Sequence, residues 1–174
     1  MTNIDNIRIR PITYDDTDLI VKWRNLDAVR NNFFYREKFT AATHLNWMDS
    51  KVKSGEVVQY IIEADGRPVG STYLRDIDRE KLSAEYGVFI GENVRGRGIG
   101  TEALKHTLAK AQSELGLKHI IARAIEGNEA SINCFLHAGF IIDDTIPDVE
   151  CSDGIRVNMV VMSKELYLYE EFID

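Results

Sequence analysis

Hydrophobic and polar residues recur with two different periods along the first half of the chain. Residues 7–10 alternate between apolar and polar positions, as a strand with one buried face does. Thr13, followed by Asp16, is typical of the start of a helix, and Asp65-Gly66 favours a tight hairpin turn. The pattern predicts a strand at 7–10, helices at 13–23, 28–33 and 40–55, a hairpin of strands at 57–64 and 68–76, and a strand at 82–90.

Helices and strands alternate one by one in the second half. The pattern predicts a helix at 101–115, a strand at 119–124, a short helix from 128 to 138 and a last hairpin from 141 to 163. The sequence contains no repeat, low-complexity tract or long linker, so we expect residues 1–174 to form one domain. A run of strands followed by strand-helix alternation predicts an α+β fold with a mixed, mostly antiparallel central sheet flanked by helices.

The composition is that of a soluble globular protein, with 44% hydrophobic and 28% charged residues. No apolar run approaches the roughly 18 residues of a membrane span, and residues 1–10 lack the apolar core of a secretory signal. We therefore expect a cytoplasmic protein without a membrane partner. The formal net charge of −7 argues against nucleic acid as a partner. Cys134 and Cys151 lack zinc-ligand spacing, and we expect no metal.

A glycine-rich loop at residues 95–100, with the sequence RGRGIG, lies between a predicted strand and a predicted helix. Backbone N–H groups converge at such a junction, and the helix N-terminus adds about half a positive charge, which suits a diphosphate. Glycine allows positive φ and lets ligand oxygens approach the main chain. A P-loop would need a lysine before Thr101, and a dinucleotide fingerprint would need different glycine spacing and a later acidic residue. The loop therefore predicts a diphosphate cradle of another kind.

Together with a second segment, this loop resembles the GNAT acetyltransferase superfamily. The pyrophosphate loop of that family reads R/Q-x-x-G-x-G/A, which Arg95, Gly98 and Gly100 match. The second segment begins at Asn128 after a strand, continues as a short helix and returns to the sheet at the Gly-Phe pair 139–140, in the family's order. The resemblance is specific over about residues 82–144 and looser in the N-terminal half.

The resemblance implies an acetyl-CoA-dependent N-acetyltransferase whose sheet is splayed between its fourth and fifth strands. Free backbone groups of the splayed strand would bond the pantetheine arm, and the glycine loop would bind the pyrophosphate. Carried over by position, the residues expected to bind acetyl-CoA are Val88, Ile90, Arg95, Gly96, Arg97, Gly98, Gly100, Thr101, Asn128 and Ser131.

Acetyl transfer to an amine requires a proton acceptor, because an unperturbed lysine-type amine has a pKa of about 10.4. We expect Glu85, near the start of the splayed strand, to take this proton directly or through a water. The backbone N–H of Ile90 would meet the developing oxyanion. Strict alternation places Glu85 on one face and Tyr86 on the other, so a bulge or the splay decides which reaches the site. The alternative is that Glu85 is a surface carboxylate.

The chain departs from the family pattern where many members carry a tyrosine that protonates the leaving thiolate. Cys134-Phe135 occupies this place in the second segment. A thiol has a pKa of about 8.5, so the thiolate can leave without a strong acid and the departure does not exclude activity. Two alternatives remain open: Cys134 as a covalent nucleophile, and a non-catalytic module that binds acyl-CoA.

The N-terminal half resembles bacterial N-acetyltransferases that act on 4-amino sugars carried on UDP, over residues 23–25 (WRN), 29–30 (VR) and 44–47 (HLNW). This resemblance implies arginines for nucleotide phosphates and aromatic groups for a sugar or base. The expected acceptor-binding residues are Arg24, Arg30, His44, Trp47, Tyr60 and Tyr73. In the alternative interpretation the tryptophans are core residues and the arginines pair with surface carboxylates.

A looser resemblance to N-terminal acetyltransferases of ribosomal proteins leaves a second acceptor open. Such an enzyme would need an open groove for an extended peptide, whereas a small amine would occupy a closed pocket. The C-terminal segment 164–174 is rich in apolar side chains. It would pack either on the domain or on a second copy in a homodimer.

Overall fold

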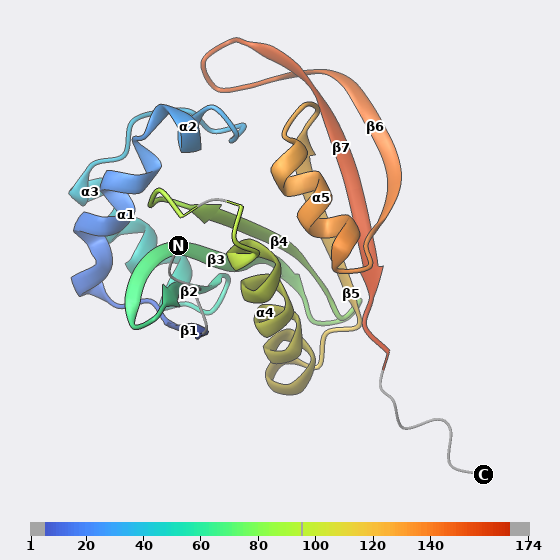
Figure 1. Ribbon diagram of the computed structural model, residues 1–174, viewed down its shortest axis with the longest axis horizontal. Helices are drawn as coiled ribbons and strands as arrows, with labels where there is room; N and C mark the ends of the chain where they lie inside the picture. The colour runs from blue at the N-terminus through green and yellow to red at the C-terminus, as the bar shows by residue number, and fades with distance from the viewer. Residues whose placement is uncertain (1–5, 95, 168–174) are drawn as a thin grey trace.

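A computed structural model describes residues 6–94 and 96–167. The strands are β1 (Ile7–Pro11), β2 (Val58–Ala64), β3 (Arg67–Asp78), β4 (Ser83–Ile90), β5 (His119–Ile125), β6 (Ile141–Glu150) and β7 (Arg156–Glu165). They form one continuous sheet in the order β1-β2-β3-β4-β5-β7-β6 (Figure 1). Neighbouring strands pair antiparallel except β4 and β5, which are parallel. This confirms the predicted mixed, mostly antiparallel sheet.

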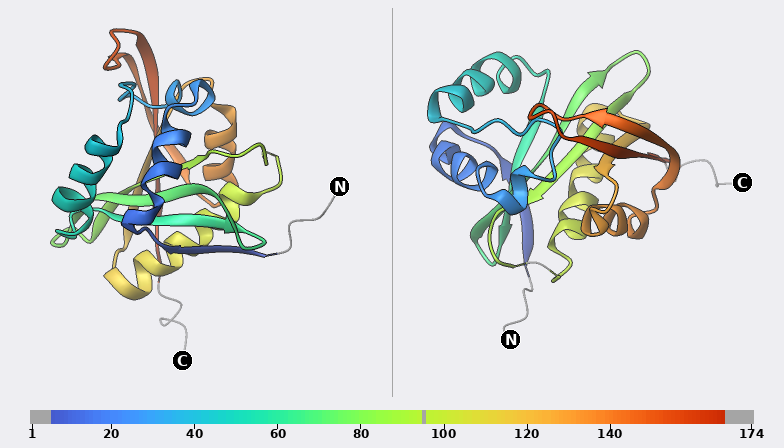
Figure 2. Two further views of the ribbon diagram at one scale, coloured as in Figure 1. Left: turned by 90° about the vertical axis from the view of Figure 1, so that its left-hand side faces the viewer. Right: turned by 90° about the horizontal axis from the view of Figure 1, so that it is seen from above.

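Helices cover both faces of the sheet. They are α1 (Thr17–Arg24), α2 (Asp27–Arg30), α3 (Ala41–Trp47), α4 (Ile99–Leu115) and α5 (Glu129–His137), with helical turns at Tyr14–Asp16 and Met48–Val52. Helices α1 and α3 lie on one face and α4 on the other (Figure 2). One apolar cluster joins α4 and α5 to the central strands around Tyr86, Leu104 and Ile120. A second joins α1 and α2 to β2 and β4 around Trp23 and Ile61.

Local sequence signals place the helix starts well and the helix lengths less well. Thr13 and Thr40 each begin a helical segment with the reciprocal contacts of a capping box. The predicted helix 40–55 corresponds to α3, which continues without a break into the π-helical segment Met48–Val52. Helix α4 begins before the predicted position 101, because Gly98 caps it in the left-handed conformation with φ of 73°.

The sheet opens between β4 and β5, which confirms the predicted splay. Their pairing ends at Tyr86 and Ala122. Beyond that point β4 stays paired with β3 as far as Ile90, and β5 stays paired with β7 as far as Ile125. The backbone of Gly87–Ile90 therefore has a sheet partner on the β3 side and a gap on the β5 side.

The C-terminal segment is described only to Tyr167. Leu166 packs against the apolar cluster of its own domain, and Tyr167 is 78% exposed. The remaining apolar side chains of this segment, at Leu168, Tyr169 and Phe172, lie outside the described residues. A homodimer therefore stays a prediction.

Candidate active site

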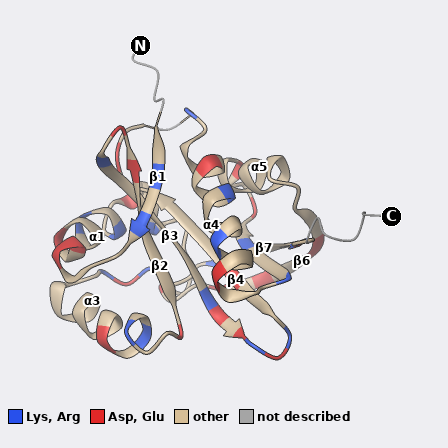
Figure 3. Cartoon of the chain, turned by 90° about the horizontal axis from the view of Figure 1, so that it is seen from below, with Lys and Arg blue, Asp and Glu red and all other residues tan. Residues whose placement is uncertain are grey.

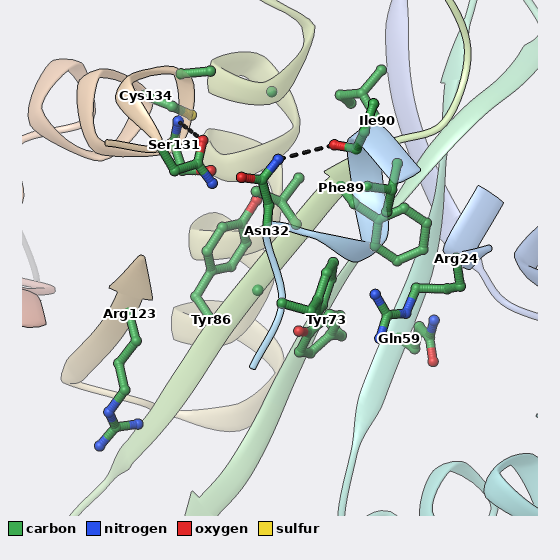
Figure 4. A pocket seen from close by; sticks show the side chains of 18 of the residues that line it. Arg24, Asn32, Gln59, Tyr73, Tyr86, Phe89, Ile90, Arg123, Ser131 and Cys134 are labelled. Atoms are coloured by element: carbon green, nitrogen blue, oxygen red, sulfur yellow. Dashed lines mark hydrogen bonds between the residues drawn. The ribbon is translucent and has the colours of Figure 1, made fainter. Parts of the chain in front are cut away.

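A cavity of about 810 Å³ extends from the gap in the sheet to the helices α1–α3 on one side and to the N-termini of α4 and α5 on the other. Figure 4 shows residues of the N-terminal helices and of strands β2 to β5 facing this space. Most of the predicted site residues line it. They are Arg24, His44, Trp47, Tyr73, Glu85, Val88, Ile90, Gly96, Gly98, Gly100, Thr101, Asn128 and Ser131.

The glycine loop forms an open cradle at the start of α4. Gly96 and Gly98 have φ of 75° and 73°, and a Cβ on either would meet no heavy atom within 4 Å. Gly100 is inside the helix and has an ordinary φ, so glycine is not needed there for the backbone conformation; the absence of a side chain leaves room in the cavity. The first N–H groups of an α-helix have no carbonyl partner within it. The loop and the N-terminus of α4 therefore place backbone N–H groups and the positive end of a helix beside the cavity, which suits the diphosphate of coenzyme A.

The structure bears differently on the two arginines of the loop that were predicted to bind acetyl-CoA. Arg95 lies outside the described residues, so its predicted role is not addressed by the structure. Arg97 is exposed and does not line the cavity, although Gly96 and Gly98 on either side of it do. Direct contact between Arg97 and a ligand in the cavity is therefore not supported.

The start of α5 forms a second wall of the cradle. Asn128 caps this helix, and its Oδ1 accepts a hydrogen bond from the Ser131 backbone N–H at 3.4 Å. Cys134 lies one turn further, where its Sγ accepts a hydrogen bond from Thr101 Oγ1 at 3.6 Å. Burial raises the pKa of the Cys134 thiol. A protonated thiol that bonds two helices together does not favour the alternative of a covalent nucleophile.

Glu85 lies at the closed end of the gap and is held by two cations. Arg75 Nη2 donates to Glu85 Oε1 at 2.6 Å, and Arg123 Nη1 donates to Oε2. Glu85 is 7% exposed as a residue and lines the cavity, so it is not a surface group. Two guanidinium partners favour the charged form over the acid, which opposes proton uptake. Glu85 as the base stays a prediction.

Glu85 and Ile90 are too far apart to serve one reacting carbon in the predicted way. They are separated by five steps along β4, which is regularly paired with β3 from Glu85 to Ile90. At about 3.3 Å per residue the separation is roughly 16 Å, more than one water can bridge. The Ile90 N–H therefore does not fit the oxyanion role beside Glu85, whereas contact between Ile90 and the pantetheine arm agrees with its place near the cradle.

Arg24, the last residue of α1, is buried and lines the acceptor half of the cavity. Its guanidinium lies 3.5 Å from the ring centre of Phe33 and 4.7 Å from that of Phe39. Nη2 donates to the Tyr35 carbonyl at 3.3 Å, while Nη1 has no partner among the described residues. Burial lowers the pKa of Arg24 to about 10, which still leaves it charged at neutral pH. A buried, charged donor without a carboxylate is suited to an anionic ligand.

His44 is buried with a defined tautomer. Thr17 Oγ1 donates its single hydrogen to the Tyr14 carbonyl at 2.7 Å, so it accepts from His44 Nδ1 at 3.1 Å. Nδ1 therefore carries the proton, and Nε2 keeps a lone pair that has no partner within the described part of the chain. Burial lowers the pKa of His44, which keeps the ring neutral. The side chain can accept a hydrogen bond from a hydroxyl or N–H group.

Two aromatic side chains border the space between His44 and the gap. Trp47 Nε1 donates to Gln59 Oε1 at 3.1 Å, and Gln59 in turn donates to Ser71. Tyr73 lies across Gly87, so that a Cβ on Gly87 would be 2.1 Å from the phenol ring. Gly87 therefore gives Tyr73 its place beside the open part of β4 (Figure 4).

Two predicted acceptor-binding residues do not line the cavity. Arg30 is partly buried and pairs at 2.9 Å with Asp27, a surface carboxylate, as the alternative interpretation predicts. Tyr60 points to the opposite face of β2, where its ring lies 5.8 Å from Lys110 of α4. Because side chains alternate along a strand, it is Gln59 that faces the cavity. Trp23 is fully buried, and its Nε1 donates to Glu92 at 2.8 Å.

Sequence reasoning missed the charged partners of Glu85. Arg75 is directly opposite Glu85 in the β3–β4 register, so a correct hairpin register would have found it. Arg123 comes from β5, which is far along the chain, and no local signal indicates the contact. The phenylalanines around Arg24 were missed for the same reason, because only the folded chain brings them to one guanidinium.

A sequence profile of the GNAT acetyltransferase domain matches residues 6–141. The chain belongs to the GNAT acetyltransferase family. The protein is accordingly an acetyl-CoA-dependent N-acetyltransferase that uses acetyl-CoA as co-substrate. The open glycine loop, the splayed β4 and the long cavity agree with this co-substrate, and Val88 and Ile90 line the cavity; their contact with the pantetheine arm and the binding of the diphosphate by the loop stay predictions.

Relatives within the family act on different amines. The L-methionine sulfoximine/L-methionine sulfone acetyltransferase of Pseudomonas aeruginosa is 28% identical over 124 residues, which cover 69% of this chain and 71% of that protein. The structure of spermidine N-acetyltransferase from Vibrio cholerae with CoA and spermine has a TM-score of 0.85 at 15% identity, covering 91% of this chain and 95% of that one. The ribosomal-protein-alanine N-acetyltransferase of Brucella melitensis has a TM-score of 0.78 at 26% identity, covering 91% and 99%.

Membrane-spanning helices are not found in the described part of the chain, where no helix is both long and apolar enough.

Proposed function

We propose that this GNAT enzyme acetylates a small amine that carries an anionic group, and that a UDP-linked amino sugar is the acceptor. The observation that supports this most is Arg24, a buried guanidinium in the acceptor half of the cavity whose Nη1 has no partner within residues 6–94 and 96–167. An unpaired buried charge is costly unless a ligand pairs with it. A phosphate of the acceptor would supply that partner.

The charges of the cavity disfavour a polyamine. Arg24, Lys38, Arg75 and Arg123 line it, whereas Glu85 is the only Asp or Glu among its described lining residues. Glu85 is already paired with two of these arginines. A polycation such as spermidine would meet net positive charge, which repels it. The fold similarity to a spermidine acetyltransferase therefore does not carry its acceptor over to this chain.

The walls around Arg24 are suited to a flat or cyclic polar group. Rings stack on planar bases and on the apolar faces of sugars. The aromatic residues that line the cavity are Phe33, Phe34, Tyr35, Trp47, Phe39, Tyr73, Tyr86, Phe89 and Phe135. His44 Nε2 adds one buried acceptor for a hydroxyl or for the N–H of a base. This combination of a cation, an acceptor and stacking surfaces favours a nucleotide-linked sugar over a simple amino acid.

The segment between α2 and α3, which lines the acceptor half of the cavity, is hydrogen-bonded to the β6–β7 hairpin. This contact favours a closed pocket over an open groove for a peptide. The tip of the β6–β7 hairpin reaches the segment between α2 and α3 (Figure 2). Ser152 N–H donates to the Phe34 carbonyl at 2.9 Å, and Arg36 N–H donates to Ser152 Oγ at 2.7 Å. Arg36 also pairs with Asp153 at 3.3 Å. An extended protein N-terminus would need this side to be open.

The test is an acceptor screen that follows thiol release from acetyl-CoA. The panel contains a UDP-linked 4-amino sugar, the same amino sugar without UDP, spermidine, methionine sulfoximine and a peptide with an N-terminal alanine. We expect the UDP-linked sugar to have the highest kcat/KM and the unlinked sugar to lose most of it. A preference for spermidine or the peptide would overturn the proposal. Cytoplasmic location stays a prediction.

A further inference from the structure

The phenol that many family members place on the helix after the second motif is absent, but another phenol touches the same position. Phe135 on α5 is 2% exposed and lines the cavity. The ring of Tyr86, from β4, packs edge-on against it, with ring centres 5.9 Å apart and planes at 87°. A tyrosine hydroxyl is therefore present beside the expected place, from a different element of the fold.

The hydroxyl of Tyr86 is buried and has no hydrogen-bond partner among the described residues. The residue is 1% exposed and lines the cavity. Thr72, which lowers the pKa of Tyr86, is a neighbouring hydroxyl whose Oγ1 bonds Thr107 Oγ1 at 3.2 Å and the Gly87 carbonyl at 3.3 Å. Figure 4 shows the hydroxyl end of Tyr86 directed toward the end of the cavity that holds Ser131 and Cys134. A buried O–H without a partner is uncommon in proteins, and a role in the chemistry of the cavity is one explanation for it.

Tyr86 also lies at the point of the strand where a thioester would stop. It forms the last β4–β5 pair, with Ala122, before the sheet opens. The diphosphate cradle follows the other end of β4, beyond Ile90. An arm that enters from the cradle along the free edge of β4 therefore passes Ile90 and Val88 first and has its sulfur end near Gly87 and Tyr86.

The protonation state of the Tyr86 hydroxyl is suited to a proton donor. Burial raises the pKa of Tyr86 well above its usual value, and the neighbouring Cys134 and Tyr73 raise it further, while Thr72 lowers it. The hydroxyl therefore keeps its proton throughout the neutral range.

We propose that Tyr86 is the proton donor to the coenzyme A sulfur, in the place of the tyrosine that Phe135 replaces. The acceptor nitrogen forms a bond to the acetyl carbon, and the carbon–sulfur bond breaks. The sulfur takes the proton of Tyr86 Oη and leaves as a thiol. The phenolate recovers a proton from the acceptor nitrogen, which must lose one to become the amide. Protons and charge balance without a further reagent.

The effect on activity is tested by removing the hydroxyl from Tyr86 and then placing one on Phe135. Tyr86→Phe is expected to lower kcat about 100-fold, the low end for an acid catalyst because a thiolate leaves readily. Adding Phe135→Tyr to that variant returns a phenol from α5 and is expected to restore a large part of the loss. Tyr60→Phe, a buried tyrosine that faces away from the cavity, is the control and is expected to have no effect. A Tyr86→Phe enzyme that folds normally and retains full kcat would overturn the proposal.

A second measurement needs no acceptor, and so stays valid if the UDP-sugar proposal fails. The thiol of bound CoA is titrated by the ultraviolet absorbance of its thiolate, with the CoA-free protein subtracted to remove Cys134. A hydrogen bond from Tyr86 stabilises the thiolate, so Tyr86→Phe is expected to raise the pKa of the bound thiol by about one to two units. The same pKa in the wild type and in Tyr86→Phe would show that the hydroxyl does not reach the sulfur.

Discussion

Gly98 is the position at which the cradle can be tested apart from the rest of the fold. Gly98→Ala adds one methyl group at the N-cap of α4, where φ is 73° and no protein atom lies within 4 Å of the new Cβ. Gly116 is a matched control at the other end of the same helix, since its φ is 64° and its surroundings are equally open. Of these two glycines, Gly98 lines the cavity and Gly116 does not.

Both substitutions should have a similar effect on stability and different effects on CoA binding. The left-handed conformation costs a non-glycine residue about 1–2 kcal/mol, which in a chain of this size lowers the Tm by about 2–8 °C. In Gly98→Ala the methyl group also occupies space needed by the diphosphate. Losing one charge-assisted hydrogen bond costs about 1.5–3 kcal/mol, which weakens binding about 10- to 100-fold.

Calorimetric titration of CoA into the wild type and both variants measures the affinity, and thermal unfolding without CoA measures the strain. We expect Gly116→Ala to bind CoA with the wild-type Kd despite its lower Tm. Gly98→Ala is expected to have the same loss of Tm and a larger Kd. Equal CoA affinities in the two variants would refute the assignment of residues 96–101 as the diphosphate cradle.

Three further predictions concern single side chains of the cavity. Glu85→Gln tests the predicted base, which takes the proton of the ammonium form of the acceptor before the step assigned to Tyr86; kcat is expected to fall about 100-fold with the Kd for CoA unchanged in calorimetry, and an unaltered kcat would remove Glu85 from the mechanism. Arg24→Met is expected to raise the KM for a UDP-linked acceptor about 10- to 100-fold through one lost charged hydrogen bond, whereas Arg30→Met, outside the cavity, leaves it unchanged. His44 has a pKa below 6.5 in the folded state, so the unfolded state binds more protons near that pH. The free energy of unfolding in urea is therefore expected to decrease as the pH falls through about 6.5, and His44→Gln should lose that slope; an equal slope in the variant would contradict burial of a neutral ring.

The conformation of the glycine loop and of the cap at Asn128 could be predicted from sequence because both depend on local backbone chemistry. Gly96 and Gly98 are recognisable since few residues other than glycine adopt their positive φ, and Asn128 is a typical cap of the helix that follows it. The main chain contacts the diphosphate in such a cradle, so the pattern of glycines contains most of the information. The order of strands and helices around it was likewise visible in the hydrophobic periods.

The acceptor half was predicted less well, because a shift of one residue along a strand changes the face. Tyr60 was expected in the cavity, but Gln59 faces it and Tyr60 contacts α4. Arg30 was expected to bind the acceptor, but it pairs with the exposed Asp27 and does not line the cavity. Residue type alone does not distinguish such neighbours, since an aromatic or an arginine is stable on either face of an amphipathic element.

The sequence by itself determined the α+β order of the elements and the conformation of the glycine loop, because both depend on residues near each other in the chain, and its motifs were enough to indicate the family. Only the tertiary structure decided that Arg123 meets Glu85 and that Tyr86 meets Phe135. Each of these pairs joins two elements through the packing of a sheet, and their distance in space depends on strand order, register and splay together. Local periodicity contains none of these three quantities, so the chemistry of the closed end of the cavity was decided by the fold.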